Sequence, residues 1–163
     1  KLRDLSIKGD TAGGVIACQI QGVPAGWGEP VFNKMNARLA FGIMGINATK
    51  GIEFGSGFLG AEHTGSQEND SFESKEKTRS NNSGGIQGGI SNGQNIFFRT
   101  AFKPVSSIKM KQKTINENGD SININIEGRH DPVVLPRAVP IIEAMASLVL
   151  ADFYLYQQIQ SIK

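Results

Sequence analysis

Alternation of apolar and polar residues predicts three β-strands along this chain. The segment 13–23 (GGVIACQIQGV) is rich in β-branched residues and ends before Pro24, which has no backbone N–H for strand pairing. The segment 50–58 (KGIEFGSGF) has Ile52 and Phe54 at alternate positions, and 95–102 (NIFFRTAF) is rich in aromatic residues. We expect all three segments to be strands.

A fourth and a fifth strand are predicted as a hairpin over residues 108–115 and 121–127. The second of these segments alternates Ile122, Ile124 and Ile126 with polar residues. Asn118 and Gly119 lie between the segments, and this pair favours the tight turns that join antiparallel strands. Antiparallel pairing is therefore expected here.

Two segments have the spacing of helices. Apolar residues recur at intervals of three and four between Val31 and Ile46, directly after Pro30, and predict an amphipathic helix. Residues 138–156 are almost wholly apolar but contain Glu143, Asp152 and an internal Pro140. Two acids and a proline fit a buried core helix better than a membrane span. We expect that helix to run from Val139 to Gln160.

Residues 62–80 contain five acidic and three basic residues, with Phe72 as the one large apolar side chain. Such a segment cannot build a core of its own, so we predict a long, mobile surface loop. Five glycines follow in residues 81–94, where a structural turn is favoured over a ligand cradle. The whole pattern predicts one domain, residues 1–163, of the α+β class, with an antiparallel sheet packed on helices.

Composition narrows the function classes. The 163 residues include 17 Lys and Arg against 15 Asp and Glu, a net charge of +2, which argues against a polybasic nucleic-acid binder. The single cysteine, Cys18, and the absence of a charged leader favour a reducing, cytoplasmic compartment. His63 has no second His or Cys at metal-ligand spacing, so no metal site is predicted.

Two short segments have side chains suited to binding or proton transfer. In 103–108 (KPVSSI), one lysine and two serine hydroxyls describe either a phosphate subsite or a solvated strand end. In 128–132 (GRHDP), Arg129 could bind an anion through two donors and Asp131 could accept a proton. The alternative is an ion pair between Arg129 and Asp131 that fixes the turn.

Five segments together resemble the chorismate synthase family, in the family's order and over nearly the whole chain. The resemblance is to the C-terminal part of the family, without the region that carries its catalytic histidines and substrate-binding arginines. The segments are GVPAGWGEPVF (22–32), INATKGIEFGSGF (46–58), NNSGGIQGGISNGQ (81–94), AFKPVSSI (101–108) and GRHDPVVLPRAVPIIEAMASLVLADF (128–153).

This resemblance implies a β-α-β sandwich that forms homotetramers. It also implies the 1,4-anti elimination of phosphate from 5-enolpyruvylshikimate 3-phosphate, with reduced flavin mononucleotide (FMN) as cofactor, to give chorismate. Whether NADPH or an external reductase reduces the flavin stays open. Without the missing region we expect either a partial flavin site with little or no turnover, or a folding and oligomerisation module.

Carried over to this chain, the resemblance also implies site residues. Asp131 corresponds to an aspartate with a proposed proton-accepting role. The flavin-contacting positions are Asn47, Ala48, Gly88, Lys103, Pro104, Val105, Ser106, Ser107 and Arg129.

Overall fold

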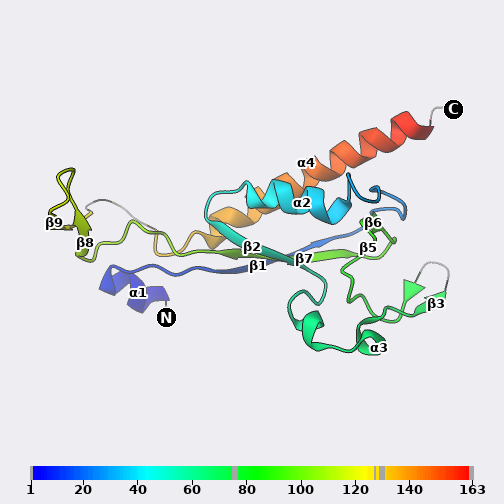
Figure 1. Ribbon diagram of the computed structural model, residues 1–163, viewed down its shortest axis with the longest axis horizontal. Coiled ribbons are helices and arrows are strands. Elements are labelled where there is room, and N and C mark those ends of the chain that lie inside the picture. The colour runs from blue at the N-terminus through cyan, green and yellow to red at the C-terminus, as the bar shows by residue number, and fades with distance from the viewer. Residues whose placement is uncertain (1, 75–76, 127, 129–130, 162–163) are drawn as a thin grey trace.

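The computed structural model describes residues 2–74, 77–126, 128 and 131–161, and its centre is a three-stranded antiparallel sheet. Strands β1 (Gly14–Ile20), β7 (Ile96–Phe102) and β2 (Thr49–Phe54) lie in the order β1-β7-β2 (Figure 1). Strand β7 alternates buried and half-buried residues along its length. It is therefore the central strand both by pairing and by burial, and the strand predictions for 13–23, 50–58 and 95–102 are confirmed with shorter bounds.

Two helices cover one face of this sheet (Figure 1). Helix α2 (Met35–Met44) buries Met35, Leu39 and Ile43, which are four residues apart and so share one side of the helix. Helix α4 (Leu135–Ser161) buries Ala138, Ile142 and Ala146, which also share one side of their helix, and it approaches α2 at Gly42, where a Cβ would lie 3.2 Å from Met145. The fully buried side chains of the core are Met35, Leu39, Ile43, Ile96, Phe98, Thr100 and Ile142.

Short elements surround the core. A hairpin of β8 (Gln112–Ile115) and β9 (Ser121–Ile124) projects beyond the sheet beside α1 (Leu2–Lys8), and it confirms the predicted hairpin (Figure 1). The remaining elements are η1 (Leu59–Glu62), α3 (Gly65–Glu68), β3 (Phe72–Ser74), β4 (Lys77–Thr78), β5 (Ile86–Gln87) and β6 (Ile90–Ser91).

Both predicted helices have different starts in the structure. The first begins at Met35 rather than Val31, because Val31 has a φ of 67° and the Glu29 N–H donates to the Asn33 carbonyl, which closes a turn. The second begins at Leu135, before the predicted Val139. It admits Pro140 within its second turn, although proline lacks the N–H that an interior helical position donates.

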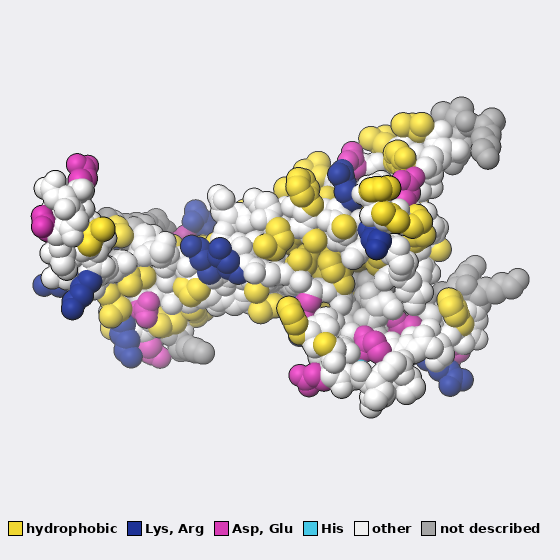
Figure 2. Space-filling model, viewed as in Figure 1, with side chains coloured by type: hydrophobic (Ala, Val, Ile, Leu, Met, Phe, Trp, Pro, Cys, Tyr) yellow, Lys and Arg dark blue, Asp and Glu magenta, His cyan; other side chains and the backbone are white. Residues whose placement is uncertain are grey.

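Helix α4 is less buried than the prediction of a central core helix requires. Its side that faces the sheet holds Ala138, Ile142, Ala146 and Phe153, whereas its C-terminal turns run away from the sheet (Figure 1). Hydrophobic side chains consequently lie at the surface over α2 and α4 (Figure 2). By length and composition α4 could cross a membrane, but core helices of soluble proteins pass the same test, so this is weak evidence.

The segment 62–80 is more ordered in conformation than a structureless loop. It contains α3, β3 and β4, and its Asp70 is only 4% exposed. Its mobility stays a prediction.

Candidate functional site

A cavity of about 790 Å³ opens where the sheet meets the first turns of α4. Three segments line it: residues 45–48 after α2, residues 102–106 at the end of β7, and the side of α4 that includes Arg137 and Ile141. Six of the predicted flavin-contacting residues lie in this lining: Asn47, Ala48, Lys103, Pro104, Val105 and Ser106. Two segments more than fifty residues apart are thus joined in one site.

Antiparallel pairing of β2 with β7 brings these segments together. Thr49 is the register partner of Phe102, so the residues just outside that pair, Ala48 and Lys103, are neighbours. The Lys103 N–H donates to the Ala48 carbonyl at 2.9 Å. Ala48 has a φ of 69°, a left-handed conformation that costs a residue with a Cβ about 1–2 kcal/mol. Such strain is often found at functional sites, where the surrounding structure fixes it.

The N-terminal part of the chain holds the 103–106 segment in place. A Cβ on Gly13 would lie 2.3 Å from the Phe102 carbonyl oxygen and 3.0 Å from Pro104, so only glycine fits there. The Thr11 hydroxyl donates to the Val105 carbonyl at 2.6 Å. These contacts fix the backbone on which Lys103 and Ser106 are carried.

The lining combines apolar walls with positive charge. Phe102, Val134, Ile141 and Met145 form the walls, and Lys103 and Arg137 are the two cations. No carboxylate is among the described lining residues. A cavity of this size, with apolar walls and two cations, suits an organic ligand that carries an anionic group. The lining therefore fits FMN.

Asp131 lies beside this cavity. Its carboxylate accepts a hydrogen bond from Arg137 Nη1 at 2.5 Å, and the Pro132 carbonyl accepts one from the Ala12 N–H at 2.9 Å. Arg129, the alternative partner considered from the sequence, lies outside the described residues. Arg137 was not singled out by sequence reasoning, because nothing in the local pattern RAVP distinguishes it from a surface arginine.

Comparisons with known proteins decide the family. A family model described as chorismate synthase matches residues 1–155. The chain is 57% identical over 150 residues to a chorismate synthase of Cytophaga hutchinsonii, and 54% identical over 154 residues to one of Christiangramia forsetii. The chain belongs to the chorismate synthase family. These alignments cover 90% and 94% of this chain but only 42% and 44% of the relatives.

A solved structure supports the fold of this chorismate synthase family member. A crystal structure of chorismate synthase matches with a TM-score of 0.77 and 32% identity, over 96% of this chain and 41% of the other. The predicted α+β class is thereby confirmed. The chain spans less than half the length of the relatives it matches.

Two further flavin-contacting positions predicted from the chorismate synthase resemblance lie outside the large cavity. Ser107 lines a small separate cavity with Thr11 and Pro132. Gly88 lines a third cavity, of about 280 Å³, with Lys34 and Ser83. The glycine-rich segment that contains Gly88 contacts the start of β7, where a Cβ on Gly85 would lie 2.9 Å from the Ile96 Cα. Lys103, by contrast, follows the end of that strand. Seven strand residues, about 20 Å, separate these ends.

Asp70 organises the glycine-rich segment and was also missed by sequence reasoning. Its carboxylate accepts hydrogen bonds from the Ser80 hydroxyl, the Asn82 N–H, and both the N–H and hydroxyl of Ser83, all at 2.7–2.8 Å. Burial alone would raise the pKa of Asp70, but these hydrogen bonds lower it below its ordinary value. No sequence motif predicts this role, since the partners are ten or more residues away.

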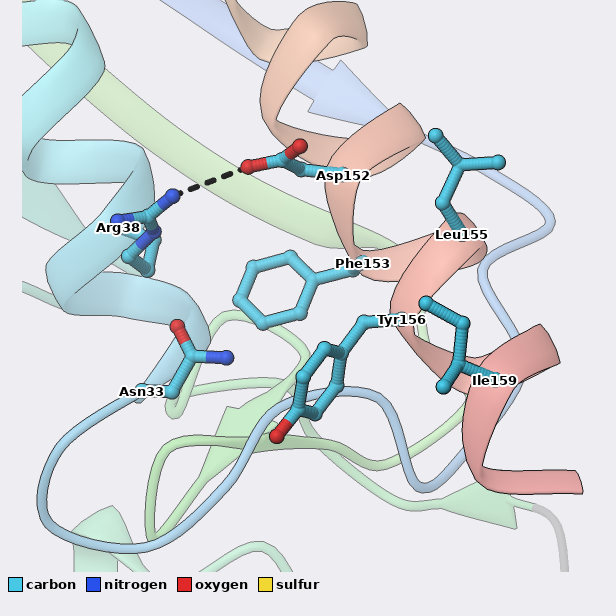
Figure 3. A pocket seen from close by; sticks show the side chains of 7 residues that line it. All are labelled: Asn33, Arg38, Asp152, Phe153, Leu155, Tyr156 and Ile159. Atoms are coloured by element: carbon cyan, nitrogen blue, oxygen red, sulfur yellow. Dashed lines mark hydrogen bonds and ion pairs between the residues drawn. The ribbon is translucent and has the colours of Figure 1, made fainter.

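A fourth depression, of about 290 Å³, lies between α2 and the C-terminal turns of α4, and it contains none of the predicted site residues (Figure 3). Arg38 on α2 and Asp152 on α4 form an ion pair across it at 3.0 Å (Figure 3). Elsewhere, His63 Nδ1 lies 2.8 Å from Glu68 Oε2, and the described residues include no group of three His, Cys, Asp or Glu suited to a metal ion.

Proposed function

We propose that this chain supplies the FMN-binding part of a chorismate synthase, an enzyme that eliminates phosphate from 5-enolpyruvylshikimate 3-phosphate to give chorismate. One observation carries the proposal: six of the nine predicted flavin-contacting residues line a single cavity of suitable size. Membership of the family supports the class of reaction in this proposal, and the lining of the cavity supports the choice of binding residues.

Each part of the cavity has a role in this proposal. Lys103 neutralises an anionic group as a point charge, and Ser106 donates a hydrogen bond to it. The backbone at Asn47 and Ala48 contacts the cofactor, and the apolar walls exclude water from its ring. When bound, reduced FMN supplies transient electron density as phosphate leaves. Asp131, held at the cavity's edge, accepts the proton removed from the substrate ring.

The rest of the activity is proposed to need the part of the relatives that this chain does not span. We expect little or no turnover from the chain alone, and conversion of the substrate by the pure chain with reduced FMN would contradict this. Reduction of the flavin by NADPH or by an external reductase, a homotetrameric assembly and a cytoplasmic location belong to the same proposal.

The second candidate function is a folding and oligomerisation module that binds no ligand by itself. The observation that favours it is the apolar surface of α2 and α4, where Phe41 is 80% and Ile159 69% exposed. Large exposed apolar patches mark surfaces that contact other protein.

A titration of oxidised and then reduced FMN into the purified chain, followed by flavin fluorescence and absorbance, separates the two. We expect saturable binding that Lys103→Ala weakens about 10-fold or more, because a charge-assisted hydrogen bond is lost. Lys113→Ala is the matched control, since Lys113 is an exposed lysine of β8 that lines none of these cavities. Absence of saturable binding would leave the module as the function of this chain.

A further inference from the structure

Arg137 is a cation in a place where helix stability does not call for one. It lies in the first turn of α4, which contains no acidic residue. The helix dipole makes this end of a helix favourable for anions and unfavourable for cations. A role outside the helix therefore accounts better for its position.

The guanidinium of Arg137 has N–H donors that the ion pair with Asp131 does not use. The recorded ion pair uses one nitrogen, Nη1, while Arg137's side chain is 76% exposed and Asp131's is 38% exposed. Arginine has five N–H donors in a planar fork, so the pair with Asp131 leaves others that can reach a second acceptor. Arg137 itself lines the large cavity, and Asp131 is not among the lining residues.

The other Arg–Asp pair among the described residues gives a useful contrast. Arg38 and Asp152 join α2 to α4, so their pairing is explained by the packing of two helices (Figure 3). Arg137 and Asp131 are six residues apart and join no separate elements. Their geometry instead holds a guanidinium at the rim of a cavity.

We propose that Arg137 is a further anion-binding residue of this site, held in place by Asp131, and that the group it binds is a phosphate monoester. This inference rests on the proposed flavin cavity. Arg137 and Lys103 are the two cations of a lining whose described residues include no carboxylate, and a phosphate monoester carries a charge of about −1.5 to −2 near neutral pH. The monoester has two possible sources, FMN and the phosphorylated substrate.

The test compares FMN with riboflavin, which lacks the phosphate. If the flavin is the source, Arg137→Ala weakens FMN binding by about 10-fold or more and leaves riboflavin binding within about 2-fold. Arg137→Lys restores part of the loss, because it keeps the charge but not the fork. Arg38→Ala, which removes an arginine paired with an aspartate away from the large cavity, is the matched control and leaves both affinities unchanged.

If the substrate is the source, Arg137→Ala leaves FMN binding unchanged and weakens binding of 5-enolpyruvylshikimate 3-phosphate instead. NMR of the arginine Nε–Hε groups, with Arg137 assigned from the Arg137→Lys spectrum, reads binding directly, including that of inorganic phosphate. A wild-type chain that binds no flavin but shows a phosphate-dependent shift at Arg137 would contradict the proposed function alone. Lack of any shift at Arg137 with FMN, substrate and inorganic phosphate would overturn the inference.

Discussion

Asp70 remains ionised in a buried position because four hydrogen-bond donors surround it. Asp70→Asn keeps the shape of the side chain but replaces one acceptor oxygen with an NH₂ group. That NH₂ group would face backbone N–H and hydroxyl donors that need an acceptor. We expect a loss of about 1–3 kcal/mol in the free energy of unfolding, measured by urea denaturation at neutral pH. A change below about 0.5 kcal/mol would mean that the segment rearranges without cost.

The same carboxylate makes stability depend on pH. Because its pKa is lowered in the folded chain, its contribution is fully present above the ordinary value of about 3.9 and is lost as the pH falls through the lower folded value. We therefore expect acid to destabilise the wild-type chain more steeply than Asp70→Asn in that range. Parallel acid-unfolding curves for the two proteins would contradict this.

Substitution of two glycines with similar φ angles distinguishes the cost of backbone strain from the cost of steric crowding around a new Cβ. Gly84 and Gly88 have φ angles of 65° and 62°, but a Cβ on Gly84 would lie 2.4 Å from the Gly55 nitrogen, while Gly88 has open space. We expect Gly88→Ala to cost about 1–2 kcal/mol through its φ alone, and Gly84→Ala to cost clearly more. Equal midpoints of urea denaturation would show that Gly55 moves aside.

At the scale of elements, α4 offers a matched pair of isoleucines. Ile142 is 1% exposed against the sheet, and Ile159 is 69% exposed near the helix end. Ile142→Ala should therefore cost about 2–5 kcal/mol and Ile159→Ala less than about 0.5 kcal/mol. Thermal or urea unfolding checks both, and a large cost at Ile159 would mean that the exposed side of α4 is covered in solution.

The strands were easier to predict than the helix starts and the site. Residues 95–102 were predicted as a strand from their aromatic content, and this held because β7 lies at the centre of the sheet, where large side chains are buried on alternate positions. The turn at Val31 depends on a left-handed backbone that a β-branched residue rarely adopts, so the first helix was predicted too long.

The exposure of α4 was missed because periodicity shows which residues share a face, not what covers it. The site depended on resemblance more than on pattern: Ala48 and Lys103 meet only through strand pairing, and Arg137 is joined to Asp131 by tertiary geometry. The roles carried over for Asp131 and for all nine flavin-contacting positions stay predictions.

For the whole molecule, the apolar surface of α2 and α4 governs behaviour in solution. Side chains such as Phe41 and Leu148 are mostly exposed, and burying such surface against another copy is favourable. We expect the average mass in sedimentation experiments to rise with concentration, and Leu148→Glu to lower it without loss of stability. A wild-type mass that stays monomeric at every concentration would contradict this expectation.

Strand β7 also determines where changes in chain length can be tolerated. It begins beside the glycine-rich segment and ends at Lys103, so the number of its residues sets the distance between two of the cavities. Deleting one residue would turn its buried face outward, and deleting two would shorten the distance by about 6.6 Å. Insertions and deletions among relatives should therefore occur in segments such as 62–80 and be rare in β7, because the length of β7 sets the spacing of the two cavities.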